Sequence, residues 1–274
     1  MARANRDIPK PSANPTYWEQ TRWPLQSLLF LLPLLVIYEL GAWWLAPAHG
    51  TRLPPIFAER LMSDFFHVLG VSGYYLPGIL VTVVLLVWHV VRRDPWKTAP
   101  KTLGLMWVES VFLAIPLIIL MATIFRQPIN PPDAEQLAML AASPNSDALA
   151  SISSWPEGVV FSIGAGIYEE LLFRLIAISL IHMVLSDLLA LPEPASSLSA
   201  VILSAVLFAV YHFDVMNPLD WTAHDWYRFG FYMFAGLYFS GVFVLRGFGI
   251  VAGTHAMYDI IVVTQHFITH EPSA

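Results

Sequence analysis

The chain has 274 residues, of which 57% are hydrophobic and only 12% are charged, whereas soluble domains carry about 25% charged residues. The net charge of −6 gives no indication of a nucleic-acid partner, and the absence of cysteine excludes disulfides, thiol catalysis and cysteine-ligated metals. This composition predicts an all-α fold, a polytopic transmembrane helix bundle in a lipid bilayer.

The first apolar run follows a short basic tail, residues 1–23, and extends from about residue 24 to residue 45. It is longer than the roughly 7–15 apolar residues of a secretory signal, and it contains Glu39. The sequence at 46–48, Ala-Pro-Ala, resembles a cleavage site but has a proline within it. We therefore expect this run to be retained as the first transmembrane helix.

Runs of similar composition recur along the chain. Spanning about 30 Å of hydrocarbon takes roughly 20 apolar residues in a helix, which predicts about seven membrane spans. After the first span comes an amphipathic stretch, residues 54–70, typical of a helix that lies on the membrane surface. The predicted spans are residues 24–46, 73–91, 103–125, 157–185, 198–216, 227–245 and 248–269.

Lysine and arginine residues are distributed unevenly between the two ends of these spans. Of the 14, nine lie on the side of the N-terminal tail, four lie on the opposite side, and Arg174 lies within a span. Because positive charge favours the cytoplasmic side, we expect the N-terminus inside the cell and the C-terminus outside.

The loop at 126–156 is rich in proline, asparagine, serine and aspartate, and we expect it to be external with a short helix at 133–142. Polar residues within the spans are concentrated after this loop, which places the chemistry in the second half of the chain. The predicted division is a cytoplasmic tail at 1–23, N-terminal membrane helices and loops at 24–150, a catalytic membrane core at 151–269 and a tail at 270–274.

The fourth predicted span contains the sequence GIYEELLFRLI, which carries Glu169, Glu170 and Arg174 into an apolar run. An ionised side chain at the bilayer centre costs about 2.5–3.5 kcal/mol on insertion scales, so such residues are usually paired or functional. Glu170 and Arg174 are four residues apart and are predicted to form an ion pair. Glu169 faces about 100° away and has no such partner, which makes it a candidate proton acceptor. The alternative is that both glutamates serve helix packing.

Two later spans contribute histidines. The sequence FAVYH places Phe208 and His212 on one helical face, and HAMYD does the same for His255 and Asp259. Asp259 can then orient the imidazole or accept its proton. Small residues precede both the glutamates and His255, which allows close helix approach. A lone histidine is more often a packed core group, but jointly these residues predict one water-containing site that also includes Glu169.

These three sequences match, in order, the motifs EExxxR, FxxxH and HxxxN/D on successive late helices. Over about residues 155–269 the chain resembles the CPBP family, which comprises CAAX prenyl endopeptidases and bacterial proteins once grouped with bacteriocin immunity. The resemblance implies an integral protein of the bacterial inner membrane. The third motif ends in Asp259, where CAAX-processing members usually have asparagine, so the substrate class stays open.

The resemblance implies an intramembrane endopeptidase of the glutamate type that acts on a membrane-anchored protein or peptide. Glu169 would be the general base that activates water, and His212 would help to hold that water. His255 and Asp259 would stabilise the oxyanion or a protonated leaving group. The other motif residues would support the site structurally: Glu170, Arg174 and Phe208.

Other functions remain open at this point. Two histidines and a carboxylate suit a zinc site with one open position, but the sequence has no HExxH motif, and we expect a metal-free site. A catalytically silent immunity or scaffold protein would not need Glu169, His212 and His255 intact. A transporter with a proton relay would carry polar residues through both halves, often as inverted repeats, and the sequence has neither.

The predicted spans also raise a geometric difficulty. They place His212 about 9 Å to the outer side of the membrane midplane and His255 about 6 Å to the inner side. A single active site requires these side chains to meet, so either a helix boundary or the arrangement of the spans must differ from the prediction.

Overall fold

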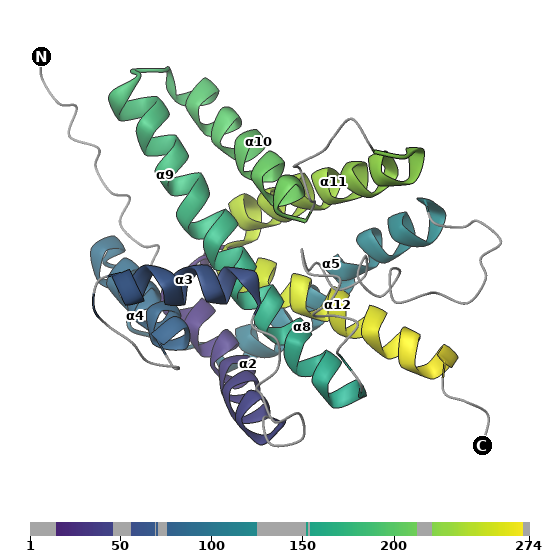
Figure 1. Ribbon diagram of the computed structural model, residues 1–274. Coiled ribbons are helices and arrows are strands. Elements are labelled where there is room, and N and C mark those ends of the chain that lie inside the picture. Colours follow the sequence, from purple (N-terminus) through teal and green to yellow (C-terminus); the bar gives the residue numbers. More distant parts are fainter. Residues whose placement is uncertain are drawn as a thin grey trace, which may run out of the picture.

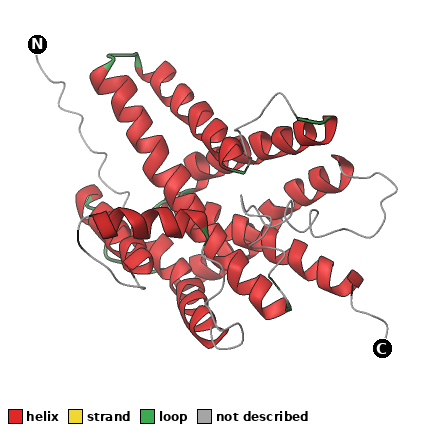
Figure 2. Cartoon of the chain, viewed as in Figure 1, coloured by secondary structure: helices red, strands yellow, loops and turns green. Residues whose placement is uncertain are grey.

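The computed structural model describes residues 15–45, 56–68, 70, 76–124, 152, 154–212 and 221–270. Within these residues the chain forms helices and connecting turns and contains no strand (Figure 2), as predicted. The elements are α1 (Tyr17–Gln20), α2 (Pro24–Leu45), α3 (Phe57–Val68), α4 (Leu76–Arg92), α5 (Pro100–Ile124), α8 (Trp155–Glu170), the π-helical η2 (Leu171–Ala177), α9 (Ile178–Met183), the π-helical η3 (Val184–Leu188), α10 (Glu193–Tyr211), α11 (Ala223–Arg246) and α12 (Phe248–His270).

In the part of the chain that the structure describes, five helical segments are long and apolar enough to cross a membrane. These confirm an integral membrane protein. Helix α4, with 17 residues, is a shorter apolar helix, and α12 is not among the five, so the number seven stays a prediction. The five segments are Pro24–Leu45, Pro100–Thr123, Trp155–Leu188, Glu193–Tyr211 and Asp225–Arg246.

The helix that carries the FAVYH sequence begins earlier than predicted. We expected a span at 198–216, but α10 begins at Glu193 because prolines at 192 and 194 define its first turn, where the fixed φ of proline suits a helix start. The helix ends at Tyr211, and His212 is its C-cap residue. The predicted boundary was therefore wrong at the N-terminal end, and His212 follows the last turn.

Helix α8 continues through η2, α9 and η3 as one rod, Trp155–Leu188, of 34 residues (Figure 1). At 1.5 Å per residue this is about 51 Å, well beyond the roughly 30 Å of a hydrocarbon core. The π-helical segment η2 begins directly after Glu170. Because π-helical turns shift the faces that later residues present and often occur at functional sites, this irregularity marks the region of the glutamates.

Helix α8 lies between α2 and α12 and packs against both. The α8–α12 crossing is close because Gly166 has no side chain: a Cβ there would lie 2.5 Å from the backbone nitrogen of Ala256. Gly253 similarly lets Phe30 of α2 approach, since a Cβ there would lie 2.6 Å from the ring. Small residues beside the motif residues thus bring three helices together, as the sequence predicts.

Segments that were predicted to lie on one side of the membrane meet at one end of the bundle. The Gln26 side chain, in the first turn of α2, donates to the carbonyl of Ala99 in the 92–101 loop at 3.1 Å. Arg246 binds Glu109 with two hydrogen bonds of 2.5 and 2.8 Å, and Glu109 also accepts from the Tyr17 hydroxyl at 2.5 Å. These contacts support a common side for the N-terminal segment, the 92–101 loop and the end of α11, while the inside orientation stays a prediction.

The amphipathic stretch forms α3, which crosses α8 and α4 (Figure 1). Ala58 and Met62 on this helix are buried, whereas Phe65 is exposed. Its location at the membrane surface stays a prediction, and the short helix expected at 133–142 lies outside the described residues.

Candidate functional site

The three sequence motifs converge at the centre of the bundle. The phenyl ring of Phe208 lies 4.4 Å from the imidazole of His212 and 6.1 Å from that of His255, centroid to centroid. The separation predicted for the two histidines was therefore wrong. None of the seven motif residues is more than 3% exposed: Glu169, Glu170, Arg174, Phe208, His212, His255 and Asp259.

Glu170 is held between two partners. Its Oε2 lies 3.0 Å from Arg174 Nε, which confirms the ion pair predicted from the four-residue spacing. Its Oε1 lies 2.8 Å from Nδ1 of His255, a contact that the sequence did not predict. The other nitrogen of His255, Nε2, lies 3.5 Å from Asp259 Oδ2. The result is a continuous row from Arg174 through Glu170 and His255 to Asp259.

The guanidinium of Arg174 is completely buried and lies against aromatic rings. Its central carbon is 4.3 Å from the ring centroid of Phe208 and 5.3 Å from that of Phe239. A desolvated cation–π contact is worth about 2 kcal/mol. Phe208 therefore packs between the arginine and both histidines, and Arg174 receives aromatic contacts in addition to its carboxylate.

Glu169 faces the other histidine. Its Oε2 lies 3.6 Å from Nε2 of His212, and its Oε1 accepts a hydrogen bond from the Tyr211 hydroxyl at 3.4 Å. Nδ1 of His212 lies 2.6 Å from the carbonyl oxygen of Phe208. Because a carbonyl can only accept, this contact assigns the proton to Nδ1 and leaves Nε2 of the neutral ring as an acceptor. Oε2 of Glu169 and Nε2 of His212 then face one another as two acceptors. This arrangement suits a third group that can donate a hydrogen bond to each.

The cluster carries more negative than positive groups. Glu169, Glu170 and Asp259 are three buried carboxyls, and Arg174 offsets one of them. Net charge is expensive within a membrane, so a buried excess of carboxyls is typical of a functional site. Groups that share protons at close range can pass them to and from a substrate.

Residues 151–261 match the family model described as type II CAAX prenyl endopeptidase Rce1-like. The resemblance to the CPBP and CAAX protease family is confirmed. The matched Rce1-like segment contains all three motifs and therefore every residue of the cluster. No curated protein and no solved structure matches the chain.

Sequence reasoning missed three aromatic residues that pack against the motif residues: Tyr211, Tyr232 and Phe239. Tyr211 is a variable position of the FxxxH motif, and its hydroxyl also accepts a hydrogen bond from the backbone N–H of Ala58 in α3. Tyr232 and Phe239 belong to α11, which carries none of the motifs. The only signal in the sequence was the abundance of aromatic residues in α11, which is equally typical of lipid-facing positions.

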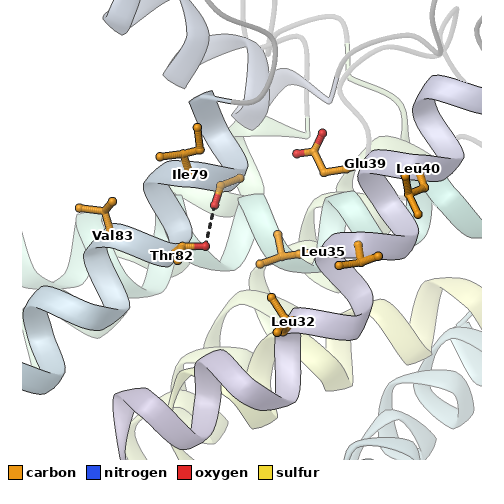
Figure 3. A pocket seen from close by; sticks show the side chains of 9 residues that line it. Leu32, Leu35, Glu39, Leu40, Ile79, Thr82 and Val83 are labelled. Atoms are coloured by element: carbon orange, nitrogen blue, oxygen red, sulfur yellow. Dashed lines mark hydrogen bonds between the residues drawn. The ribbon is translucent and has the colours of Figure 1, made fainter.

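A groove between α2 and α4 lies apart from the Rce1-like cluster (Figure 3). Glu39 at one end accepts a hydrogen bond from the Tyr168 hydroxyl at 3.4 Å, and the Thr82 hydroxyl donates to the carbonyl of Gly78 at 3.1 Å. The groove has no histidine among its lining residues and suits hydrocarbon rather than hydrolysis. It is lined by Leu32, Leu35, Val36, Glu39, Leu40, Gly78, Ile79, Thr82 and Val83.

Among the described residues, no group of three histidine or carboxylate side chains has the arrangement of a metal site. Each histidine faces a glutamate, His212 next to Glu169 and His255 next to Glu170, and His255 also has Asp259 near Nε2.

Proposed function

We propose that the protein is an intramembrane endopeptidase of the glutamate type that hydrolyses a peptide bond in a membrane-anchored protein or peptide. The observation that carries this proposal is the buried Glu169–His212 pair, with acceptor atoms 3.6 Å apart, inside a segment that matches a family of endopeptidases. The bilayer is the surrounding solvent, and the family resemblance favours the inner membrane of a bacterium.

In the proposed reaction, a water molecule donates hydrogen bonds to Glu169 and His212. Glu169 takes one proton as the water oxygen bonds to the scissile carbonyl carbon, and the carbonyl π electrons move to the oxygen to give an oxyanion. The carbonyl of Phe208, which holds Nδ1 of His212, keeps Nε2 directed at the water. General-base catalysis of this kind contributes about 10²–10⁴-fold to a rate.

His255 serves the second half of the reaction. Nδ1 is held by Glu170 at 2.8 Å, while the 3.5 Å separation of Nε2 from Asp259 exceeds most N–H···O bonds. In the proposed reaction His255 is an imidazolium, protonated on both nitrogens, and its Nε2–H stabilises the oxyanion. Collapse of the oxyanion breaks the C–N bond, the leaving amine takes the proton that Glu169 accepted, and a carboxylic acid and an amine are released.

The proposed reaction needs no metal, so the experiment that tests it also tests the metal requirement. The purified protein in nanodiscs is incubated with two peptides that share the same soluble segment, one farnesylated at a C-terminal CAAX cysteine and one anchored by an added apolar helix. Fragments are identified by mass spectrometry, with and without a zinc chelator. We expect cleavage that survives the chelator and disappears in Glu169→Gln.

Each other outcome decides against part of the proposal. Cleavage that the chelator abolishes and zinc restores would establish the zinc-dependent alternative. Normal cleavage by Glu169→Gln would remove Glu169 as the base. A folded wild-type protein that binds either peptide without cleaving it would favour the scaffold or immunity alternative, and the preferred peptide identifies the type of membrane anchor.

A further inference from the structure

Helix α11 carries none of the three motifs, yet it places one aromatic ring flat against each histidine of the cluster. The ring of Tyr232 stacks on His212 with centroids 4.3 Å apart and planes inclined by 14°. The ring of Phe239 stacks on His255 with centroids 4.6 Å apart and an inclination of 20°. The two aromatic residues are seven positions apart, almost two helical turns, and therefore share one face of α11.

This face of α11 is fixed in place. Tyr232 is 3% exposed and Phe239 is 2% exposed. The hydroxyl of Tyr232 accepts a hydrogen bond from Arg228, one turn earlier on the same helix. Between the two rings lies Gly236, where a Cβ would be 3.0 Å from the Cα of Ala205 in α10. The close approach of α10 and α11 thus holds the rings at a constant distance from the helix that carries His212.

A ring stacked flat on an imidazole limits how far the imidazole can tilt. His212 is held at Cβ by its backbone and at Nδ1 by the carbonyl of Phe208, and the stacked ring of Tyr232 adds a restraint on the tilt of the imidazole plane. Tilting moves Nε2 away from Glu169, and catalytic groups must be held to within about 10–20° of their productive orientation. A ring packed on the face of the imidazole, as Tyr232 is, opposes this tilt.

We infer that Tyr232 and Phe239 are positioning residues that fix the planes of the two imidazoles, which makes α11 the fourth helix of the active site. This inference rests on the proposed peptidase function. Tyr232 has the larger effect, because His255 already has a carboxylate near each nitrogen, Glu170 and Asp259. The Tyr232–His212 stack is also the closer and the flatter of the two.

The test separates the flat ring from the hydroxyl and from packing. Tyr232→Phe keeps the ring and loses the bond to Arg228, whereas Tyr232→Leu keeps an apolar side chain and loses the flat face. We expect kcat to stay within about 3-fold of wild type in Tyr232→Phe and to fall about 10–100-fold in Tyr232→Leu, with KM unchanged. Phe239→Leu should lower kcat less than Tyr232→Leu does.

The matched control is Phe231→Leu. Phe231 is 4% exposed and neighbours Tyr232 in the chain, but its ring contacts are with Tyr232 and Tyr258. If Phe231→Leu and Tyr232→Leu lose the same amount of kcat and folded protein, the role of Tyr232 is packing and the inference is wrong. Should Tyr232→Leu fail to fold, the same measurements are made on Tyr232→Met. This variant also lacks the flat ring, and its side chain is more adaptable.

A measurement without substrate keeps the inference separate from the proposed function. In ¹⁵N-histidine-labelled protein, the His212 signals are assigned by their loss in His212→Asn. Ring-current shifts on His212 should stay close to those of wild type in Tyr232→Phe and Phe231→Leu. They should change in Tyr232→Leu, where only the contributions of neighbouring rings such as Phe208 and Tyr211 remain. Unchanged shifts in Tyr232→Leu would overturn the inference. Absence of wild-type cleavage would instead overturn the peptidase function, whatever the spectra show.

Discussion

Two glutamates adjacent in the chain lie in opposite kinds of environment. Glu170 contacts Arg174 at 3.0 Å and His255 at 2.8 Å, so a cation and an imidazole both hold it. Glu169 lies 3.6 Å from His212, and it accepts a hydrogen bond from the Tyr211 hydroxyl at 3.4 Å. One carboxylate is bound tightly and the other loosely, although both are almost fully buried.

The comparison shows how one helix can assign different roles to neighbouring residues of the same type. Consecutive residues face about 100° apart on a helix, so Glu169 and Glu170 meet different helices, the end of α10 and the middle of α12. The tightly held carboxylate links three helical segments. In the proposed reaction, the loosely held one has fewer strong contacts to give up when it takes a proton from water.

The largest expected effect is the loss of catalysis in Glu169→Gln. The substitution preserves size and hydrogen-bonding capacity but removes the base, so kcat should fall by about 10²–10⁴-fold, with the Tm in detergent close to that of wild type. Initial cleavage rates and thermal unfolding of the purified protein provide the measurement. Near-normal cleavage by folded Glu169→Gln would mean that the loosely held carboxylate is not the base.

The second effect is on stability and concerns the tightly held carboxylate. Arg174→Ala leaves Glu170 without its buried cation, which should cost about 3–5 kcal/mol of folding free energy and lower the folded yield far more than Glu169→Gln does. Arg92→Ala is the matched control, because Arg92 is 39% exposed where it pairs with Asp94, and a pair with an exposed member is worth less than a fully buried one. Equal folded yields for all three variants would contradict a structural role for the Glu170–Arg174 pair.

The third effect concerns the close contact of α8 and α12 beside His255. Gly166→Ala inserts a Cβ 2.5 Å from the nitrogen of Ala256, next to His255, and should destabilise the protein by about 1–3 kcal/mol through overpacking. Gly241→Ala is the control, because among the described residues no atom beyond its chain neighbours and its own helix backbone lies within 4 Å of a Cβ there, and alanine favours the helix by up to about 1 kcal/mol. Opposite shifts in Tm are expected, and a similar Tm for both variants would refute the close α8–α12 approach.

The smallest effect is expected for Asp259→Asn. An asparagine oxygen can still face Nε2 of His255, so activity should stay within about 10-fold of wild type, the value of roughly one hydrogen bond. Asp259→Ala removes the acceptor and should lose more. If Asp259→Asn is as inactive as Glu169→Gln in the peptide assay, the negative charge of Asp259 takes part in the reaction itself.

The sequence by itself predicted features that depend on local spacing and composition. Apolar runs of about 20 residues required membrane helices, because backbone groups in lipid must bond within their own helix. The four-residue spacing predicted the Glu170–Arg174 pair, which the structure confirms. The order of the three motifs led to the family that residues 151–261 match.

Only the tertiary structure decided which groups from different helices meet. Nothing in the spacing could show that His255 contacts Glu170 rather than Glu169, or that α11 stacks Tyr232 and Phe239 on the two imidazoles. Those contacts depend on how the helices cross, and the crossings depend on where small residues such as Gly166 allow backbones to approach. Helical periodicity is a property of one segment, whereas the partner of each buried side chain is set by the packing of all of them.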